Sequence, residues 1–204
     1  MKSEYKPPKS KKVEAILQAA RDLFSVKGFE STPVAEVARR ANVADGTVIY
    51  YFKTKENLLF ILTRQIFYEL YKSAREAAVK EGQTAMQALE SFVDAHARFV
   101  IDKRSDYMVL LKADPFRILS KETTDYQDAH LYASLQVELI SEILKRGVAA
   151  QEFAEIDFKN VSYTIYSMLL CAGRFMSTVE GVGLPLYEEI KTFIRMRLHP
   201  GNAS

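Results

Sequence analysis

Residues 28–59 read GFESTPVAEVARRANVADGTVIYYFKTKENLL, and the order of turn residues and apolar residues in this stretch decides the fold. Thr32 is expected to be the N-cap of a short helix, with Pro33 in its first position, where no N–H group is needed. Asn42 can end that helix, because asparagine tolerates the left-handed backbone conformation. Only three residues then separate it from a second short helix, which we predict over residues 46–52.

Two short helices joined by a turn of three or four residues are the geometry of a helix-turn-helix, the motif that places its second helix in the major groove of DNA. We predict this motif over about residues 33–52. In the second helix, Val48 and Phe52 are four residues apart and are expected to point inward together. The outer face then carries polar and aromatic side chains that suit contact with base edges and phosphates. These outward residues are Thr47, Tyr50 and Tyr51.

The rest of the chain is also predicted to be helical, because apolar residues recur at steps of three and four and strand-like alternation is absent. Before the motif, a stripe from Val13 to Phe24 that stops at Gly28 predicts the third helix of the head. After the motif, Thr54 is expected to cap a long helix that runs to about Gly82. Further helices are expected over residues 84–100, 106–111, 135–147, 157–180 and 185–198, with caps at Thr84 and Asp157 and a loop at Gly181, Gly183 and Pro185.

The predicted fold class is therefore all-α, with about nine helices. We expect two domains. A three-helix N-terminal helix-turn-helix domain covers residues 9–55, and a larger C-terminal helical ligand-binding and dimerisation domain covers residues 56–204.

Charge is unevenly distributed between these two parts. Residues 1–55 hold eleven Lys or Arg and six Asp or Glu, a net charge of +5, while the whole chain has +2 and residues 56–204 therefore carry −3. A basic head on a mildly acidic body suggests that the head binds a polyanion. A solubilising basic tail is the alternative, and charge alone leaves both open.

Composition excludes several classes of protein. The single cysteine, Cys171, cannot form an intramolecular disulfide, and we expect it to be a buried, inert thiol. The three histidines are far apart in the sequence, so we expect no metal and no cofactor. No apolar run reaches the roughly 18 residues of a membrane helix. The start, MKSEYKPPKSKK, lacks the apolar segment of a secretory signal, so we expect a cytoplasmic protein.

No grouping of nucleophile, base and acid is visible, and neither is a phosphate-binding loop, so we expect no enzyme. A helical scaffold that binds another protein is a further alternative. It does not account for the basic head or for the order of cap, turn and second helix.

The stretch quoted above resembles the N-terminal domain of the TetR (tetracycline-repressor-like) transcriptional regulators. Their pattern reads Gly-aromatic, a Thr/Ser cap, a short helix ending in Ala-Gly-Val, then Gly-Thr-Leu-Tyr-Tyr-His-Phe and Ser-Lys-Glu-x-Leu. The match covers about residues 10–65, and the remainder is similar only in being all-helical and of suitable length. Asn42 stands for the usual glycine, Ala44 for a Ser/Thr cap, Ile49 for the first tyrosine and Tyr51 for the histidine. The operator sequence therefore cannot be taken from a relative.

The resemblance implies DNA contacts from the basic arm, the recognition helix and the start of the next helix. Lys55 opens that next helix, whose N-terminal end attracts phosphate. Asp45 leaves two interpretations open, since its carboxylate either accepts a hydrogen bond from a cytosine amino group or caps the helix. The predicted DNA-contact residues are Lys9, Lys12, Val34, Ala44, Asp45, Gly46, Thr47, Tyr50, Tyr51, Lys53 and Lys55.

The resemblance also implies a homodimer through the helices at about 157–180 and 185–198, because a dimer presents two heads to operator half-sites about 34–36 Å apart. The sequence fits, since the 157–180 helix is apolar over much of its circumference and Ala172 and Gly173 allow close approach. The alternative is that this helix is buried within one chain.

An effector pocket within the larger domain is implied as well. The candidate residues are Phe92, His96, Phe99, Tyr107, His130, Tyr166 and Arg174. For each the alternative is an ordinary hydrogen-bonded core residue. The predicted function is a ligand-responsive transcriptional regulator that binds a double-stranded DNA operator. We expect a repressor that a small hydrophobic or amphipathic effector releases from a palindromic operator, with activation left open.

Overall fold

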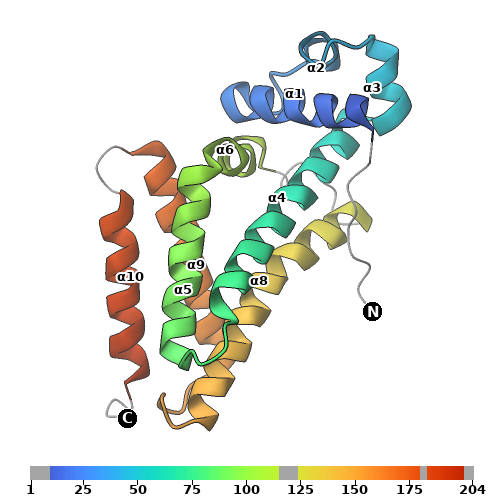
Figure 1. Ribbon diagram of the computed structural model, residues 1–204. Coiled ribbons are helices and arrows are strands. Elements are labelled where there is room, and N and C mark those ends of the chain that lie inside the picture. The colour runs from blue at the N-terminus through green and yellow to red at the C-terminus, as the bar shows by residue number, and fades with distance from the viewer. Residues whose placement is uncertain (1–9, 115–123, 180–182, 200–204) are drawn as a thin grey trace. The chain divides into compact units, whose positions relative to one another are not determined.

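The computed structural model describes residues 10–114, 124–179 and 183–199, and it describes side chains throughout these ranges except at residues 124–130, 132 and 133. Every regular element in these ranges is an α-helix, which confirms the all-α fold class (Figure 1). The described helices are α1 (Lys11–Lys27), α2 (Val34–Arg40), α3 (Asp45–Phe52), α4 (Lys55–Ala78), α5 (Ala85–Asp102), α6 (Arg104–Ala113), α8 (Thr124–Ala149), α9 (Phe158–Thr178) and α10 (Gly183–Leu198).

The described residues divide into two compact units. The first comprises those of Met1–Phe67 and Ser105–His130, and the second those of Tyr68–Arg104 and Leu131–Ser204. Helix α4 contributes its first half to one unit and its second half to the other, and α6 belongs to the unit of the head apart from its first residue.

The head is built on the apolar stripe of α1, which the structure buries as expected, with Ile16 and Phe24 fully enclosed. Gly28 ends the helix with φ of +81°. The predicted cap of the next helix is wrong. Thr32 is buried and donates its hydroxyl proton to the Gly28 carbonyl oxygen (2.8 Å), so Pro33 takes the N-cap position and α2 begins at Val34.

Helices α2 and α3 follow as two short helices joined by a tight turn (Figure 1). Asn42 adopts φ of +53° in that turn, as predicted. Ala44 occupies the N-cap of α3, and its side chain makes no capping bond. Asp45 is therefore the first helical residue and not the cap, and the side-chain cap is lost at a cost of about 1 kcal/mol.

Helix α6 packs on α1 within the first unit. Asp106 is buried and forms an ion pair with Arg21 of α1. Lys112 donates from Nζ to the backbone oxygen of Val26, 2.7 Å away, in the last turn of α1. A Cβ atom added at Gly28 would lie 3.4 Å from the backbone oxygen of Lys112. The close approach of α6 therefore depends on the end of α1.

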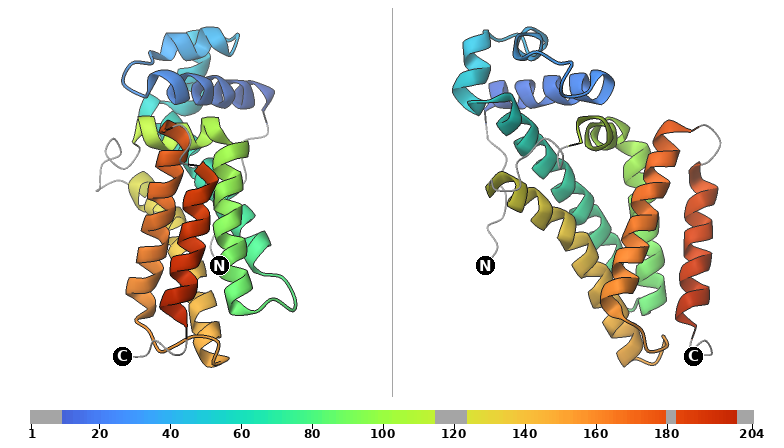
Figure 2. Two further views of the ribbon diagram at one scale, coloured as in Figure 1. Left: turned by 90° about the vertical axis from the view of Figure 1, so that its left-hand side faces the viewer. Right: turned by 180° about the vertical axis from the view of Figure 1, so that it is seen from behind.

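In the second unit, α5, α9 and α10 run side by side (Figures 1 and 2). Thr84 caps α5 in a capping box with Gln87, and Asp157 caps α9 through the Asn160 N–H, as the sequence predicts. Aromatic and aliphatic side chains of α5, α8, α9 and α10 form one buried cluster. On its outside, Lys191 bonds Asp94 at 2.9 Å and so ties α10 to α5.

Several expectations for this unit are wrong. Helix α4 ends at Ala78 and not near Gly82, and α10 begins at Gly183, so the predicted loop residue Pro185 lies inside the helix. Cys171 is exposed and not buried, because it lies on the outer face of α9. Ala172 and Gly173 are buried within the same chain, so neither is available for close approach to a partner helix.

Candidate nucleic-acid interface

The outer face of α3 carries a group of large exposed side chains. Val48 and Phe52 are buried, and this anchors the helix by one face as predicted. On the other face Ile49 is 46 %, Tyr50 70 % and Tyr51 39 % exposed. Three large side chains within one turn of a short helix form a surface that folding leaves uncovered.

The rings of Tyr50 and Tyr51 pack edge to face. Their centroids lie 5.1 Å apart with an interplanar angle of 81°. The Lys53 ammonium lies 5.5 Å from the centroid of the Tyr50 ring, and Lys53 ends the helix with φ of +65°. The contacts restrain Tyr50 from two sides, so the face is partly organised before any partner binds.

Lys55, the first residue of α4, is half-buried and bonded within the head. Its ammonium donates to the backbone oxygens of Phe29 (3.1 Å) and Thr32 (3.3 Å), and it lies 4.2 Å from the centroid of the Phe29 ring. Thr54 caps α4 by accepting from the Asn57 N–H at 3.0 Å. The start of α4 is therefore fixed to the turn between α1 and α2.

Some basic side chains of the head are paired with acids. Arg40 donates to Asp22 from Nη2 at 2.7 Å and from Nε at 3.1 Å, and Lys27 pairs with Glu36 at 2.5 Å. Other cations form no ion pair with any side chain that the structure describes and are exposed. These are Lys11, Lys12, Arg39 and Lys53. They supply a positive charge that a polyanion could neutralise.

The structure brings most of the predicted DNA-contact residues onto the head. Ala44, Asp45, Gly46, Tyr50, Tyr51 and Lys53 are exposed on or beside α3, and Thr47 is half-buried there. Lys12 is exposed on α1 and Val34 is half-buried at the start of α2, while Lys9 lies outside the described residues.

Two further residues of the head are exposed and are absent from the predicted set. Ile49 is exposed between the predicted contacts, and its position three residues after Gly46 was the available signal. Arg39 is exposed at the end of α2, but its surroundings in the sequence gave no sign that it stays unpaired.

The predicted effector residues are not brought together in one cavity. Phe92, His96 and Tyr166 are buried in the second unit, Phe99 is buried at the end of α5, and Tyr107 is buried in the first unit. Arg174 is exposed on α9, and the side chain of His130 lies outside the described residues.

His96 is held by a specific contact. Its Nδ1 atom is hydrogen bonded to the Tyr187 hydroxyl at 2.9 Å, and burial lowers its pKa from 6.5 to about 4. Burial also raises the pKa of Tyr166 well above its ordinary value. Both side chains are therefore neutral near pH 7, and neither provides a charge inside the unit.

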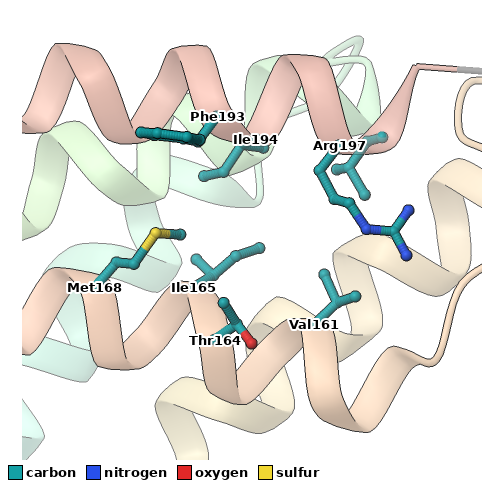
Figure 3. A pocket seen from close by; sticks show the side chains of 8 residues that line it. Val161, Thr164, Ile165, Met168, Phe193, Ile194 and Arg197 are labelled. Atoms are coloured by element: carbon teal, nitrogen blue, oxygen red, sulfur yellow. The ribbon is translucent and has the colours of Figure 1, made fainter. Parts of the chain in front are cut away.

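A second exposed apolar surface runs along α9 and α10. Its large exposed side chains are Tyr163, Leu170, Phe175, Val179, Leu184, Phe193 and Met196. Between the helices lies a groove of about 260 Å³, into which Ile165 and Met168 point from α9 and Phe193 and Ile194 from α10 (Figure 3). Phe193 is 60 % exposed at its edge.

No helix among the described residues has the length and hydropathy needed to cross a membrane. Over the same residues, no group of three or more His, Cys, Asp or Glu side chains is placed to hold a metal ion.

The chain matches the family of bacterial regulatory proteins of the tetR type over residues 16–61. It is 38 % identical over 204 residues to the probable HTH-type transcriptional regulator YttP of Bacillus subtilis (strain 168), covering 94 % of this chain and 96 % of YttP. It is 32 % identical over 88 residues to the fatty acid metabolism regulator protein of the same organism, a match that spans 43 % of this chain and 45 % of that protein.

The fold is similar to that of a bacterial regulatory protein in the tetR family from Rhodococcus RHA1. The TM-score is 0.80 at 22 % identity, over 93 % of this chain and 98 % of the other. These relatives are transcriptional regulators and not enzymes. The head with its exposed α3 and the full-length match lead to one conclusion: this chain belongs to the tetR family of bacterial regulatory proteins and is a DNA-binding transcriptional regulator.

Proposed function

We propose that this regulator is a homodimeric repressor that leaves a palindromic operator when a small hydrophobic or amphipathic molecule binds its larger domain. The proposal that the head binds DNA depends on the outer face of α3. On this face Ile49, Tyr50 and Tyr51 stay exposed, while the opposite face of the helix is buried. Exposed side chains of this size on a short helix fit the width of a major groove. A small dimer that covers its operator represses by obstructing polymerase.

In this proposal residues 9–55 are the DNA-binding domain and residues 56–204 the effector and dimerisation domain. The contacts to DNA come from the eleven residues predicted from the sequence, with Ile49 and Arg39 added. The lysines position the head on phosphates, while Tyr50, Tyr51 and Ile49 read base edges.

A second copy of this chain is the proposed occupant of the apolar surface on α9 and α10. Each helix carries large exposed apolar residues, and the groove between them accepts a protruding side chain such as Phe193 of the other copy. A two-fold contact uses the same surface on both copies and therefore covers both grooves at once. Such a dimer sets the spacing of the two recognition helices.

The proposed response to an effector depends on α4, which is one unbroken helix with residues in both units. Its first half belongs to the unit of the head and its second half to the other unit, and Lys55 fixes its start to the turn between α1 and α2. A tilt of this helix would move the head, and the size of the response is limited by the effector's difference in affinity for the two states. The matched B. subtilis protein named for fatty acid metabolism supports an amphipathic effector as a starting point.

The test is a fluorescence anisotropy titration of duplexes selected from a randomised pool. We expect palindromic sequences to be enriched, two chains to bind per site, and the logarithm of affinity to fall against that of salt by about 0.9 for each neutralised phosphate. Absence of duplex binding in dilute buffer would refute the proposal. Binding that no hydrophobic or amphipathic compound weakens would refute its effector part.

A further inference from the structure

A cavity of about 510 Å³ lies in the second unit where α5 and α9 end and α10 begins. Its walls are polar and apolar in about equal part, and the polar side-chain groups are one guanidinium and two hydroxyls. The lining residues are Val100, Ile101, Arg104, Met176, Ser177, Thr178, Val179 and Gly183. This volume lies in the range of small-molecule sites, and a wall with both apolar and polar side chains suits an amphipathic molecule. None of the effector residues predicted from the sequence lines it.

The guanidinium of Arg104 is held in place at this cavity. Its Nη2 atom donates to the backbone oxygen of Ser177, 3.1 Å away, in the last turn of α9. That bond satisfies one of the carbonyl groups that the end of a helix leaves without a partner. It is the single hydrogen bond of this side chain within the described part of the protein. An arginine has five N–H donors, so most of them stay available in a fixed orientation.

The Ser177 hydroxyl is the second polar group, and it is unusual. The Ser177 side chain is 5 % exposed, and its oxygen has no hydrogen-bond partner among the described residues. Serine and threonine in helices commonly donate to the carbonyl four residues earlier. Thr178 does so with Arg174 (2.8 Å), and Ser162 does so with Phe158 (2.6 Å). A buried hydroxyl without a partner is costly, and a bound ligand atom would satisfy it.

The charge at the cavity wall favours an anion. Arg104 carries a full positive charge, and Gly183 is the first residue of α10, so the N-terminal end of that helix, which carries a positive partial charge, lies at the wall. A planar guanidinium fits a carboxylate with two parallel hydrogen bonds. The side chains of Val100, Met176 and Val179 offer an apolar surface for the rest of the molecule.

We propose that this cavity is the effector site and that its ligand is an amphipathic carboxylic acid in its ionised form. Arg104 binds the carboxylate, the Ser177 hydroxyl donates to it, and the apolar wall covers the tail. The inference rests on the proposed function, because it assigns a site to the effector invoked there.

A ligand bound at Arg104 would be connected to the head through one helix, α6. Arg104 is the first residue of α6, and Asp106, two positions later, forms the ion pair with Arg21 of α1. Lys112, on the same helix, donates to the end of α1 at Val26. A ligand that pulls on Arg104 therefore acts on the helix that contacts α1.

The experiment is calorimetric titration of the full chain with decanoate, which combines a carboxylate with an apolar tail. We expect one site per chain, with much weaker binding of decan-1-ol, of acetate and of inorganic phosphate. Arg104→Met keeps the apolar stem and removes the charge, and should weaken decanoate binding at least tenfold. Ser177→Ala should weaken it several-fold. The control Lys103→Met removes a neighbouring exposed charge that does not line the cavity, and should change nothing.

Equal decanoate affinity in the native chain and in both Arg104→Met and Ser177→Ala would overturn the site, as would the absence of any binding. The same samples are then titrated with a selected duplex. Release of DNA by decanoate in the native chain but not in Arg104→Met supports the whole proposal. Tight decanoate binding through Arg104 that leaves DNA affinity unchanged would retain the site and refute its role as the effector site.

Discussion

The Lys55 ammonium lies 4.2 Å from the centroid of the Phe29 ring and donates to the Phe29 backbone oxygen, so the first residue of α4 holds the turn that leads from α1 to α2. Its second bond goes to Thr32. Two of its three N–H donors are therefore used within the head, and the third is left for a DNA phosphate. The side chain both holds the head together and adds a positive charge to it.

Lys55→Met should show both roles. We expect the free energy of unfolding to fall by about 2 kcal/mol, because bonds from a charged donor are lost. DNA affinity should fall alike for all sequences, and the salt slope should flatten by about 0.9. Urea unfolding and anisotropy at several salt concentrations measure the two effects. Lys12→Met is the control, with a flatter slope and unchanged stability. A less stable Lys55→Met with an unchanged slope would show that the residue only holds the turn.

Tyr51 should determine sequence preference and contribute little to stability. Its ring is exposed and contacts the Tyr50 ring edge to face. Tyr51→Ala should leave the unfolding free energy within about 0.5 kcal/mol, as expected for a surface position. The duplexes selected from a randomised pool should differ at one position in each half-site. If the variant selects the same duplexes as the native chain, Tyr51 does not read bases.

Ala44→Ser should stabilise the head. Ala44 stands at the N-cap of α3 with φ of −70° and ψ of 148°, the extended conformation that a capping serine adopts, but it has no side-chain oxygen. A serine there can accept a hydrogen bond from the first turn, and this should add about 1 kcal/mol to the free energy of unfolding. Ala35→Ser, at an exposed position inside α2, is the control and should not stabilise. Equal effects of the two changes would contradict the absence of a cap.

Caps and local apolar spacing could be predicted from the sequence, because both depend on neighbours within one turn of helix. The capping by Thr54 and the inward position of Val48 are examples.

Thr32 was misassigned because its hydroxyl bonds backward to Gly28, a choice that the residue type does not determine. Cys171 was misplaced because α9 is apolar on two sides, and only packing shows which side faces the core. The pairing of Arg104 with the end of α9 joins residues 73 positions apart and had no local signal.

His96 should make the second unit sensitive to acid. Burial lowers its pKa from 6.5 to about 4, so between these values the unfolded chain binds a proton that the folded chain does not. Stability therefore falls as pH drops from about 6.5 to 4, by about 3 kcal/mol from this residue. His96→Gln cannot titrate and can still bond Tyr187. Urea unfolding at pH 7 and pH 4 measures this effect. The unfolding free energy of the native chain minus that of the variant should be lower at pH 4 than at pH 7 by that amount. A constant difference would show that His96 is not kept neutral by the fold.

Phe193→Glu should convert the proposed dimer into monomers. The side chain projects from α10 at the edge of the groove in Figure 3, and a carboxylate placed in a self-complementary apolar contact is desolvated on both copies. Sedimentation velocity should show the native chain at twice the mass of the variant at micromolar concentration. Val79→Glu, at an exposed apolar residue outside α9 and α10, should stay dimeric.

Cys171 gives an independent readout of the same contact, since it is exposed on α9 and is the single cysteine of the chain. In the proposed dimer we expect Cys171 to lie near the two-fold axis, where a residue faces its own copy, so a bismaleimide should link two native copies and fail to link Phe193→Glu. Cross-linking that persists in Phe193→Glu at equal yield would place the contact between copies elsewhere. The loss of the dimer should also lower operator affinity steeply, since each head alone reads only one half-site.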